Sequence, residues 1–279
     1  MTYIVSLGPL ARQGVPLVTL IADLANAGFG GVSIDPQLML EMTDTVRRDV
    51  ASAVADLELV VALHGSFDTP IEDLGNLADL LGPQLGNITF DPVLGWTSAG
   101  LIFSTKRMSP YLQELENLAK QHGFSYGVED FPETPFALQM YQDDLSPLLE
   151  SDRFGILIDI GHFNESVHKY GYYKGVNPEE HFAQLPLRLL EVHLSDNNGK
   201  EDQHLPLGMG TIDFASVARG LRKIGFDGLS TIEIEPTGKH EDAIASAKEQ
   251  ITGSLAFWRE LLEKENMKGP HHKADAGDG

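Results

Sequence analysis

The hydrophobic pattern of the chain alternates between two kinds of segment. Short apolar runs rich in β-branched residues are followed by longer stretches in which apolar residues recur three and four positions apart. The first kind is typical of buried strands and the second of amphipathic helices. The predicted strands are Tyr3–Leu7, Gly31–Ile34, Leu57–Leu63, Asn87–Phe90, Ser125–Glu129, Gly155–Asp159, Leu189–Leu194 and Leu229–Ile234. The clearest predicted helices are Leu17–Ala27, Ile71–Leu81, Pro110–His122, Phe214–Ile224 and Ala243–Leu262.

Eight strands that alternate with helices predict a (β/α)8 TIM barrel of the α/β class. A repeat of about 33 residues over about 265 residues agrees with the usual size of such barrels. A doubly wound sheet is the alternative, but it usually carries a glycine-rich phosphate turn after its first strand. Here that turn reads Ser6-Leu7-Gly8-Pro9-Leu10, which has no such pattern. We expect one barrel domain over residues 1–265 and a small, polar, disordered tail over residues 266–279.

The charge of the chain argues against polyanionic partners. Lys and Arg number 20 and Asp and Glu number 41, so the formal net charge is −21. Such a surface repels nucleic acid and anionic membranes. The basic pairs Arg47–Arg48, Lys106–Arg107 and Arg222–Lys223 have helical spacing and are interpreted as solvated helix faces. We therefore expect neither a nucleic-acid partner nor a membrane partner.

Cysteine is missing from the sequence. This excludes disulfides, thiolate nucleophiles and Cys-type zinc sites. No apolar run approaches the ~18 residues of a membrane span, and the N-terminus lacks the basic and then apolar pattern of a signal peptide. These features predict a cytoplasmic protein.

Ionisable side chains fall at the carboxyl ends of successive predicted strands, where a TIM barrel builds its active site. A buried unpaired charge is costly, so a run of such residues indicates a functional site. Carboxylates and neutral imidazoles together are ligands for a divalent cation such as Zn, Mn, Co, Fe or Mg. The residues concerned are His64, Asp91, Glu129, Asp159, His193, Glu233 and Glu235.

Further candidates follow the sixth and seventh predicted strands. His162 comes three residues after the sixth strand ends, and we expect Gly161 to allow a sharp bend so that a turn presents the imidazole. Asp202 and His204 lie in a loop rich in Asp, Asn and Gly after the seventh strand. Alone, such a loop is an ordinary turn. Its place directly after His193 predicts a second row of metal ligands or substrate contacts.

Several motifs in the C-terminal half resemble, in the same order, those of the xylose-isomerase-like TIM barrel superfamily. That superfamily contains sugar and sugar-phosphate isomerases and epimerases and the class II AP endonucleases. The N-terminal half matches mainly by the rhythm of its strands. The motifs are Gly127-Val-Glu129, Leu157-Ile-Asp159-Ile-Gly-His162, Val192-His193-Leu-Ser-Asp196, Asp202-Gln-His204-Leu-Pro-Leu-Gly208-Met-Gly210-Thr-Ile-Asp213 and Gly225-Phe-Asp227-Gly228-Leu-Ser-Thr-Ile-Glu233.

The resemblance to the isomerases and epimerases implies one catalytic metal with four protein ligands. It also implies that His162 contacts the substrate. It also implies that two glutamates move a proton at the carbon next to the substrate carbonyl, which is the chemistry that a metal and paired carboxylates suit. Glu235 is the alternative ligand from the last strand. The implied ligands are Glu129, Asp159, His193 and Glu233.

The resemblance to the AP endonucleases implies a multi-metal phosphodiesterase instead. The same four ligands would then be joined by further residues, which are His64, His162, Asp202 and His204. Asp91 stands where that family carries a histidine, and His204 stands where several epimerases carry an arginine. Each pattern therefore has one departure in this chain.

These observations lead to a divalent-metal-dependent sugar or sugar-phosphate isomerase or epimerase with a small polyhydroxy substrate. The net charge of −21 disfavours the alternative, an AP endonuclease-like hydrolase, because duplex DNA is a polyanion. A metal-dependent dehydratase and a non-catalytic barrel are weaker alternatives, since a fold does not fix a reaction. Trp96 and Phe103 are candidates for a lid, for core packing or for a contact in a homo-oligomer.

Overall fold

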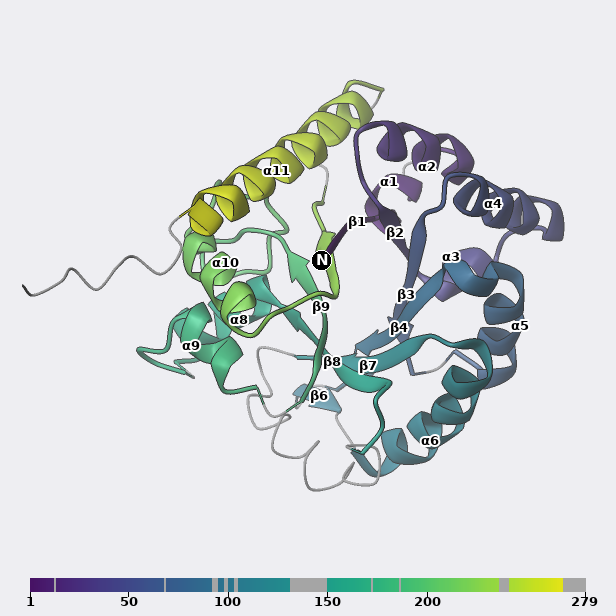
Figure 1. The fold of residues 1–279 in the computed structure, drawn as a ribbon, viewed down its shortest axis with the longest axis horizontal. Coiled ribbons are helices and arrows are strands. Elements are labelled where there is room, and N and C mark those ends of the chain that lie inside the picture. Colours follow the sequence, from purple (N-terminus) through teal and green to yellow (C-terminus); the bar gives the residue numbers. More distant parts are fainter. Residues whose placement is uncertain are drawn as a thin grey trace, which may run out of the picture.

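Eight parallel strands close into a barrel in the order β1-β2-β3-β4-β7-β8-β9-β10, and β10 pairs with β1 again. The computed structural model describes residues 1–12, 14–67, 69–91, 95–97, 100–102, 105–130, 150–171, 173–185, 187–235 and 241–267 (Figure 1). The predicted TIM barrel is confirmed. Its strands are β1 (Thr2–Ser6), β2 (Gly31–Ile34), β3 (Val60–Ser66), β4 (Leu85–Asp91), β7 (Ser125–Glu129), β8 (Phe154–Asp159), β9 (Leu189–Leu194) and β10 (Leu229–Ile232).

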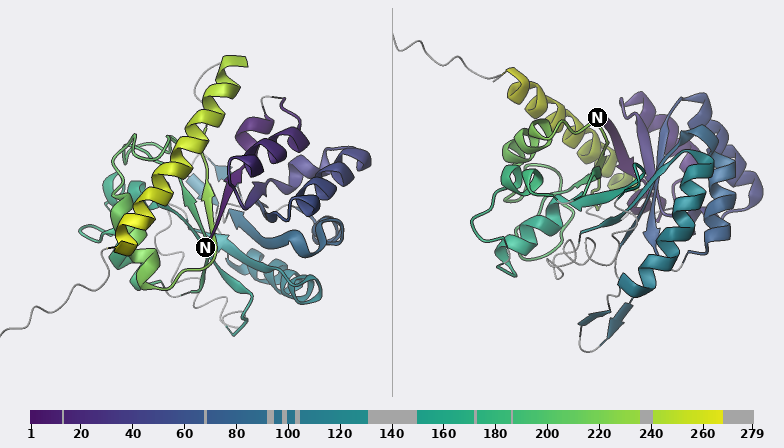
Figure 2. Two further views of the ribbon diagram at one scale, coloured as in Figure 1. Left: turned by 45° about the horizontal axis from the view of Figure 1, so that its top comes forward. Right: turned by 60° about the horizontal axis from the view of Figure 1, so that its bottom comes forward.

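Helices surround the strands, and the long α11 packs beside α10 on the outside of the barrel (Figure 1). A short antiparallel hairpin, β5 (Gly95–Thr97) and β6 (Gly100–Ile102), follows β4 and stands away from the barrel (Figure 2). Among the described helices, none has a stretch long and apolar enough to cross a membrane. The helices are α1 (Gly8–Ala11), α2 (Leu17–Asn26), α3 (Pro36–Leu40), α4 (Asp44–Asp56), α5 (Ile71–Leu81), the 3-10 turn η1 (Gly82–Gln84), α6 (Thr105–His122), α8 (Ile160–His168), α9 (Pro178–Ala183), α10 (Phe214–Lys223) and α11 (Glu241–Met267).

The third strand was predicted three residues too early. Leu57 is the C-terminal cap of α4, and Glu58 takes a left-handed backbone with φ 53°, so the chain turns there before β3 begins. Pattern alone cannot separate the apolar end of a helix from the apolar start of a strand. The helix α11 also extends to Met267, two residues beyond the predicted domain boundary. The remainder of the predicted tail, and Phe103, lie outside the described residues, as does the side chain of Trp96.

The interior of the barrel changes from apolar to ionisable along the strand direction. Ile4, Ala62 and Leu229 form a separate apolar cluster, while the larger core lies between the strands and the helices. Side chains two positions apart on a strand point to the same face. On β10 this alternation takes the interior face from Leu229 through buried Thr231 to Glu233 just beyond the strand. The polar side chains therefore collect at the carboxyl ends of the strands, which is where the predicted site lies.

Candidate metal centre

Four strand ends bring together the residues that sequence analysis predicted as ligands. Glu129 ends β7, Asp159 ends β8, His193 lies on β9, and Glu233 follows β10. The Nδ1 atom of His193 lies 2.9 Å from Oε2 of Glu233, 3.8 Å from Oε1 of Glu129 and 3.9 Å from Oδ2 of Asp159. The backbone N–H of Glu233 donates to the carbonyl of Leu194 at 3.1 Å, which fixes the last ligand against β9. One imidazole nitrogen thus faces three carboxylates.

The donor set fits a divalent cation. Oδ2 of Asp159 and both ring nitrogens of His193 are buried and make no hydrogen bond, although the nitrogens lie within ion-pair distance of carboxylates. Buried polar atoms normally have a hydrogen-bond partner. Burial and the nearby carboxylates of Asp202 and Glu129 raise the pKa of Asp159. Burial alone would lower the pKa of His193, but Glu233 and Glu191 raise it well above its ordinary value. Both shifts favour bound protons near the carboxylates. A divalent cation would replace such protons when it binds to these side chains.

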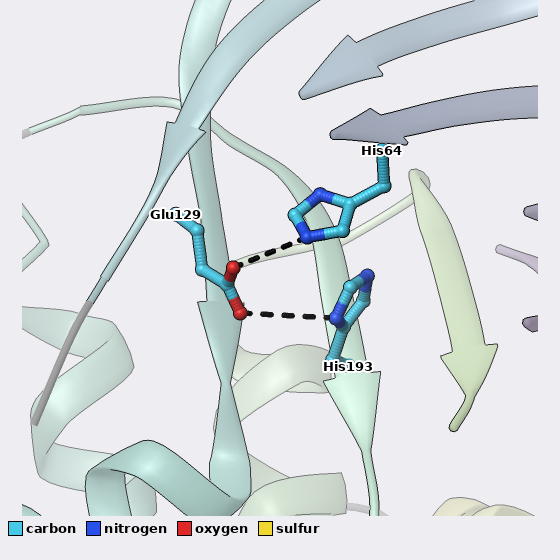
Figure 3. Close-up of side chains that lie close together, drawn as sticks. All are labelled: His64, Glu129 and His193. Carbon is cyan, nitrogen blue, oxygen red and sulfur yellow. Dashed lines mark ion pairs between the residues drawn. The ribbon is translucent and has the colours of Figure 1, made fainter. Parts of the chain in front are cut away.

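His64 on β3 approaches the centre from the other side. Its Nε2 atom lies 3.3 Å from Oε2 of Glu129, and its ring meets that of His193 edge-on at 4.9 Å between centroids (Figure 3). Its Nδ1 atom lies 3.0 Å from the hydroxyl of Thr89. Among the described residues, His64, Glu129 and His193 form one of three sets whose ligand atoms lie within 4.8 Å of one another. The others are Glu129, Asp159 and His162, and Asp159, His193 and Glu233.

His162 enters the centre from a helix and not from a turn. Asp159 is the N-cap of α8, and its Oδ1 atom accepts from the backbone N–H of His162 at 2.9 Å. The bend predicted at Gly161 is absent, because the helix begins directly at Ile160. Gly161 is instead required for close packing, since a Cβ atom would lie 2.9 Å from Oδ1 of Asp159. The helical start aims His162 at Glu129, with Nδ1 3.5 Å from Oε1.

The loop after β9 is held by one buried carboxylate. Asp196 is fully buried, and its two oxygens accept from the backbone N–H groups of Asn197, Gly208, Gly210 and Ile212 at 2.8–3.2 Å. A Cβ atom on Gly210 would overlap this carboxylate and the carbonyl of Asn197. The backbone N–H groups of the glycine-rich motif that sequence analysis singled out therefore bind the Asp196 carboxylate. These hydrogen bonds hold the two ends of the loop between Asp196 and Gly208 together.

That loop delivers Asp202 and His204 to the edge of the centre. Nε2 of His204 lies 2.9 Å from Oδ2 of Asp202, and the same oxygen lies 3.7 Å from Nε2 of His162. His204 has a left-handed backbone with φ 45°, which is uncommon outside glycine and clusters at functional sites. Asp202 and Glu233 outweigh the effect of burial and raise the pKa of His204 to about 10. Asp202 and His204 therefore lie at the edge of the centre, and their role as metal ligands or substrate contacts stays a prediction.

Four predicted candidates lie outside the ligand sets of the described residues: Asp202 and His204 at the edge of the centre, and Asp91 and Glu235. Glu235 is 49% exposed, pairs with Arg12 and belongs to none of these sets. The strand β10 ends at Ile232, so the two-residue alternation that would place Glu235 on the same face as Glu233 does not continue to Glu235. Asp91, together with Asp35, lines a cavity of about 430 Å³ beside His64 and Glu233. Its other lining residues include the hydroxyls of Ser6, Ser33 and Ser66.

Sequence reasoning missed Glu191 and assigned no role to Asp130, although Asp130 directly follows the end of β7. Glu191 is a fully buried carboxylate on β9 with Oε1 3.4 Å from Nε2 of His193. Its position two residues before His193 was a usable signal, because both then share the interior face. Oδ1 of Asp130 accepts from the backbone N–H of Asp159 at 2.7 Å, and burial raises the pKa of Asp130 to about 8. The cavity residues of β1 and β2 carried no motif.

Comparison with known proteins gives a family match and two partial relatives. The model of a family described as xylose isomerase-like TIM barrel matches residues 104–261, more than half of the chain. An uncharacterized protein of Methanocaldococcus jannaschii is 33% identical over 164 residues, which are 56% of this chain and 52% of that protein. A second protein of the same organism is 26% identical over 127 residues, 44% of each chain. The chain thus spans about half the length of the curated relatives it matches.

Solved structures share the fold over nearly the whole chain. The D-psicose 3-epimerase of Clostridium cellulolyticum H10, crystallised with D-tagatose, superposes with a TM-score of 0.73 at 13% identity over 94% of this chain and 99% of that chain. A D-tagatose 3-epimerase-like protein superposes with a TM-score of 0.65 at 21% identity, over 94% of this chain and 100% of that chain. The IolI protein with a bound zinc atom superposes with a TM-score of 0.69 at 16% identity, over 95% of this chain and 99% of that chain. These likenesses establish a common barrel architecture.

Proposed function

The chain belongs to the xylose isomerase-like TIM barrel family, and we propose that it is a divalent-metal-dependent isomerase or epimerase of a small polyhydroxy ketone or aldehyde. The observation that carries the proposal is the convergence of Glu129, Asp159, His193 and Glu233 around buried ligand atoms that lack hydrogen-bond partners. Structural neighbours with epimerase names, and one with zinc, support it.

The four proposed ligands combine three carboxylates with one imidazole. Asp159 and His193 are almost completely buried, at 1% exposure each, so they form the rigid part of the site. The 20% exposed Glu233 faces the cavity, which is where a substrate would enter. A bound cation would polarise the carbonyl and hydroxyl oxygens of the substrate and so acidify the C–H bond between them.

Glu129 and Glu233 are the proposed proton carriers. Burial would raise the pKa of each, but His64, His162 and His193 lower that of Glu129, and His193 and His204 lower that of Glu233. Both are therefore carboxylates at neutral pH, which is the form that can accept a proton from carbon. They stand on β7 and next to β10, with β8 and β9 between them, and so flank the centre.

The cavity suits a small polyhydroxy molecule. Its volume of about 430 Å³ lies within the usual size of ligand sites. Its lining residues include three serines, a glutamine and an aspartate, which are Ser6, Ser33, Ser66, Gln37 and Asp35. Groups of this kind bind substrate hydroxyls by accepting and donating hydrogen bonds.

The test is solvent exchange of the proton at the reacting carbon. The protein is stripped of metal, reloaded with Zn, Mn, Co, Fe or Mg, and incubated in D2O with free ketoses, aldoses and their phosphates. Proton NMR then detects deuterium at the carbon next to the carbonyl, whatever the product. We expect metal-dependent exchange that Glu233→Gln abolishes and that Glu249→Gln, at an exposed position of α11, leaves unchanged. Lack of exchange with every sugar and metal would refute the proposal.

A multi-metal phosphodiesterase is the second candidate, and the overlapping ligand sets favour it. Among the described residues, Glu129, Asp159 and His193 each belong to two of the three ligand sets, so the centre has donors for more than one ion. In-line phosphoryl displacement uses several cations. Asp91 and the net charge of −21 oppose this reading. We expect about one tightly bound metal per chain and no cleavage of abasic-site DNA. Two or more tight equivalents, with DNA cleavage abolished by Asp202→Ala, would favour this second function.

A further inference from the structure

A further carboxylate, that of Glu191, lies inside the barrel, one layer of side chains below the proposed ligands. Glu191 is fully buried on β9, and Val192 between it and His193 points to the opposite face. The side chain of His193 therefore stands directly above that of Glu191. A fully buried carboxylate is rare unless it is paired or hydrogen-bonded.

The contacts of Glu191 come from three strands. The hydroxyl of Thr231 on β10 donates to Oε1 at 2.5 Å, and the side-chain amide of Asn87 on β4 donates to Oε2 at 3.5 Å. Oε1 also lies 3.4 Å, an ion-pair distance, from Nε2 of His193, a buried nitrogen that has no hydrogen-bond partner. Thr231 and Asn87 are themselves buried, at 0% and 7% exposure. The carboxylate is thus held in one place by groups that do not reach the metal centre, and it faces the imidazole.

The two nitrogens of His193 face different partners. Nδ1 faces the carboxylates of Glu129, Asp159 and Glu233, and Nε2 faces Glu191. A neutral imidazole that ligates through one nitrogen carries its proton on the other. A metal-bound histidine usually donates that second N–H to a carboxylate, carbonyl or water, and this fixes its tautomer and raises its basicity.

We propose that Glu191 is the positioning residue of His193: its carboxylate accepts the Nε2–H and keeps Nδ1 turned toward the cation. This inference rests on the metal site proposed above. Thr231 and Asn87 have a supporting part, because Thr231 donates to the oxygen that faces the imidazole and Asn87 donates to the other oxygen. The contacts that link Thr231 and Asn87 through Glu191 to His193 therefore all come from strands of the barrel.

The test compares zinc affinity and the protonation of His193 in folded variants. Zinc affinity is measured by competition with a chromophoric chelator, and the ring N–H of His193 is followed by NMR in zinc-loaded protein with 15N-labelled histidine, assigned through His193→Ala. Ser230→Ala is the matched control. It removes a buried hydroxyl from the same strand as Thr231, but its partner is Trp258 on α11, on the outer side of the barrel.

We expect Glu191→Gln to weaken zinc binding about 10-fold and Glu191→Ala about 100-fold, the range found for such partners of metal ligands. The Nε2–H resonance of His193 should shift in both variants, which a purely structural role would not cause. Ser230→Ala should keep the wild-type affinity and resonance. If Glu191→Ala does not fold, the isosteric Glu191→Gln decides.

Two results would overturn the inference. The first is a zinc affinity of Glu191→Gln within twofold of the wild type together with an unshifted Nε2–H resonance, which would refute the positioning role of Glu191. If His193→Ala loses zinc affinity in the same experiment, the proposed metal site is still supported. Wild-type affinity in His193→Ala would refute both the site and this inference.

Discussion

His181 provides a quantitative test of how burial acts in this fold. It is 5% exposed, its Nε2 atom has no hydrogen-bond partner, and its ring lies 4.5 Å from that of Phe163 and 5.0 Å from that of Tyr173, measured between centroids. This burial lowers the pKa of His181 to about 4 from an ordinary value of 6.5. The folded protein therefore keeps the imidazole neutral where the unfolded chain protonates it.

The sign and size of the effect follow from linkage. Between pH 6.5 and pH 4, unfolding takes up a proton at this residue, so the free energy of unfolding falls as the pH falls. The loss contributed by His181 is about 2 kcal/mol at pH 5 and about 3 kcal/mol at pH 4. Below pH 4 both states are protonated and no further loss arises from His181. For a protein with a stability of 5–15 kcal/mol, roughly, this is a large share.

The assay is urea denaturation of metal-free protein at pH 7 and pH 5, followed by circular dichroism. His181→Phe should lose about 2 kcal/mol less stability between these pH values than the wild type, because phenylalanine does not titrate. Phe182→Leu is the control, since it alters the neighbouring core side chain without a titrating group, and its cost should be the same at both pH values. An equal loss of stability in wild type and His181→Phe would refute the reasoning.

The remaining predictions concern the site and its loop. Glu129→Gln and Glu233→Gln should each reduce turnover by more than tenfold without unfolding the protein, because the amide keeps the shape but cannot bind a cation or accept a proton; circular dichroism and the solvent-exchange assay check this. His193→Ala should weaken metal binding more than His162→Ala, measured by calorimetry, because His193 stands on a buried strand and His162 begins a helix. Gly210→Ala should cost about 2 kcal/mol or more in thermal unfolding, because the new methyl overlaps a backbone carbonyl and a buried carboxylate.

Each of these has its own contrary outcome. Turnover within tenfold of wild type in either glutamine variant would remove that glutamate from the reaction. Equal losses of metal affinity in the two histidine variants would make both histidines ligands and favour more than one ion. Gly253→Ala on α11 is the control for Gly210→Ala, because no atom lies within 4 Å of the added Cβ. It should leave stability unchanged or raise it by up to about 1 kcal/mol.

The strands of the barrel were predictable because each is a short apolar run bounded by turns. The strand Gly31–Ile34 matches β2 residue for residue, and Ile71–Leu81 matches α5. The same approach placed the start of β3 too early, because Leu57 is apolar but belongs to a helix cap. It also extended the last strand beyond Ile232 and so paired Glu235 with Glu233 on one face.

The candidate site was predictable where a residue ends a strand, and less so elsewhere. Glu129, Asp159 and His193 converge because barrel closure brings neighbouring strand ends together, a long-range constraint that strand order already contains. The pairing of Asp196 with the glycine-rich segment spans 14 residues to Gly210 and depends on backbone N–H groups, which carry no sequence signal of their own. Glu191 was missed because it lies within β9, whereas the pattern of candidate residues involved strand ends and the segments that follow them.

Glu129 belongs to two of the three ligand sets, with His64 and His193 in one and Asp159 and His162 in the other. All of these side chains stand on or next to strands whose positions are fixed by closure of the barrel. A change in the number of bound ions therefore requires only side-chain substitutions at strand ends, with no rearrangement of the backbone. For protein engineering, the strand ends are therefore the positions at which to vary the number of candidate ion ligands while the barrel is kept, because a fold does not fix a reaction.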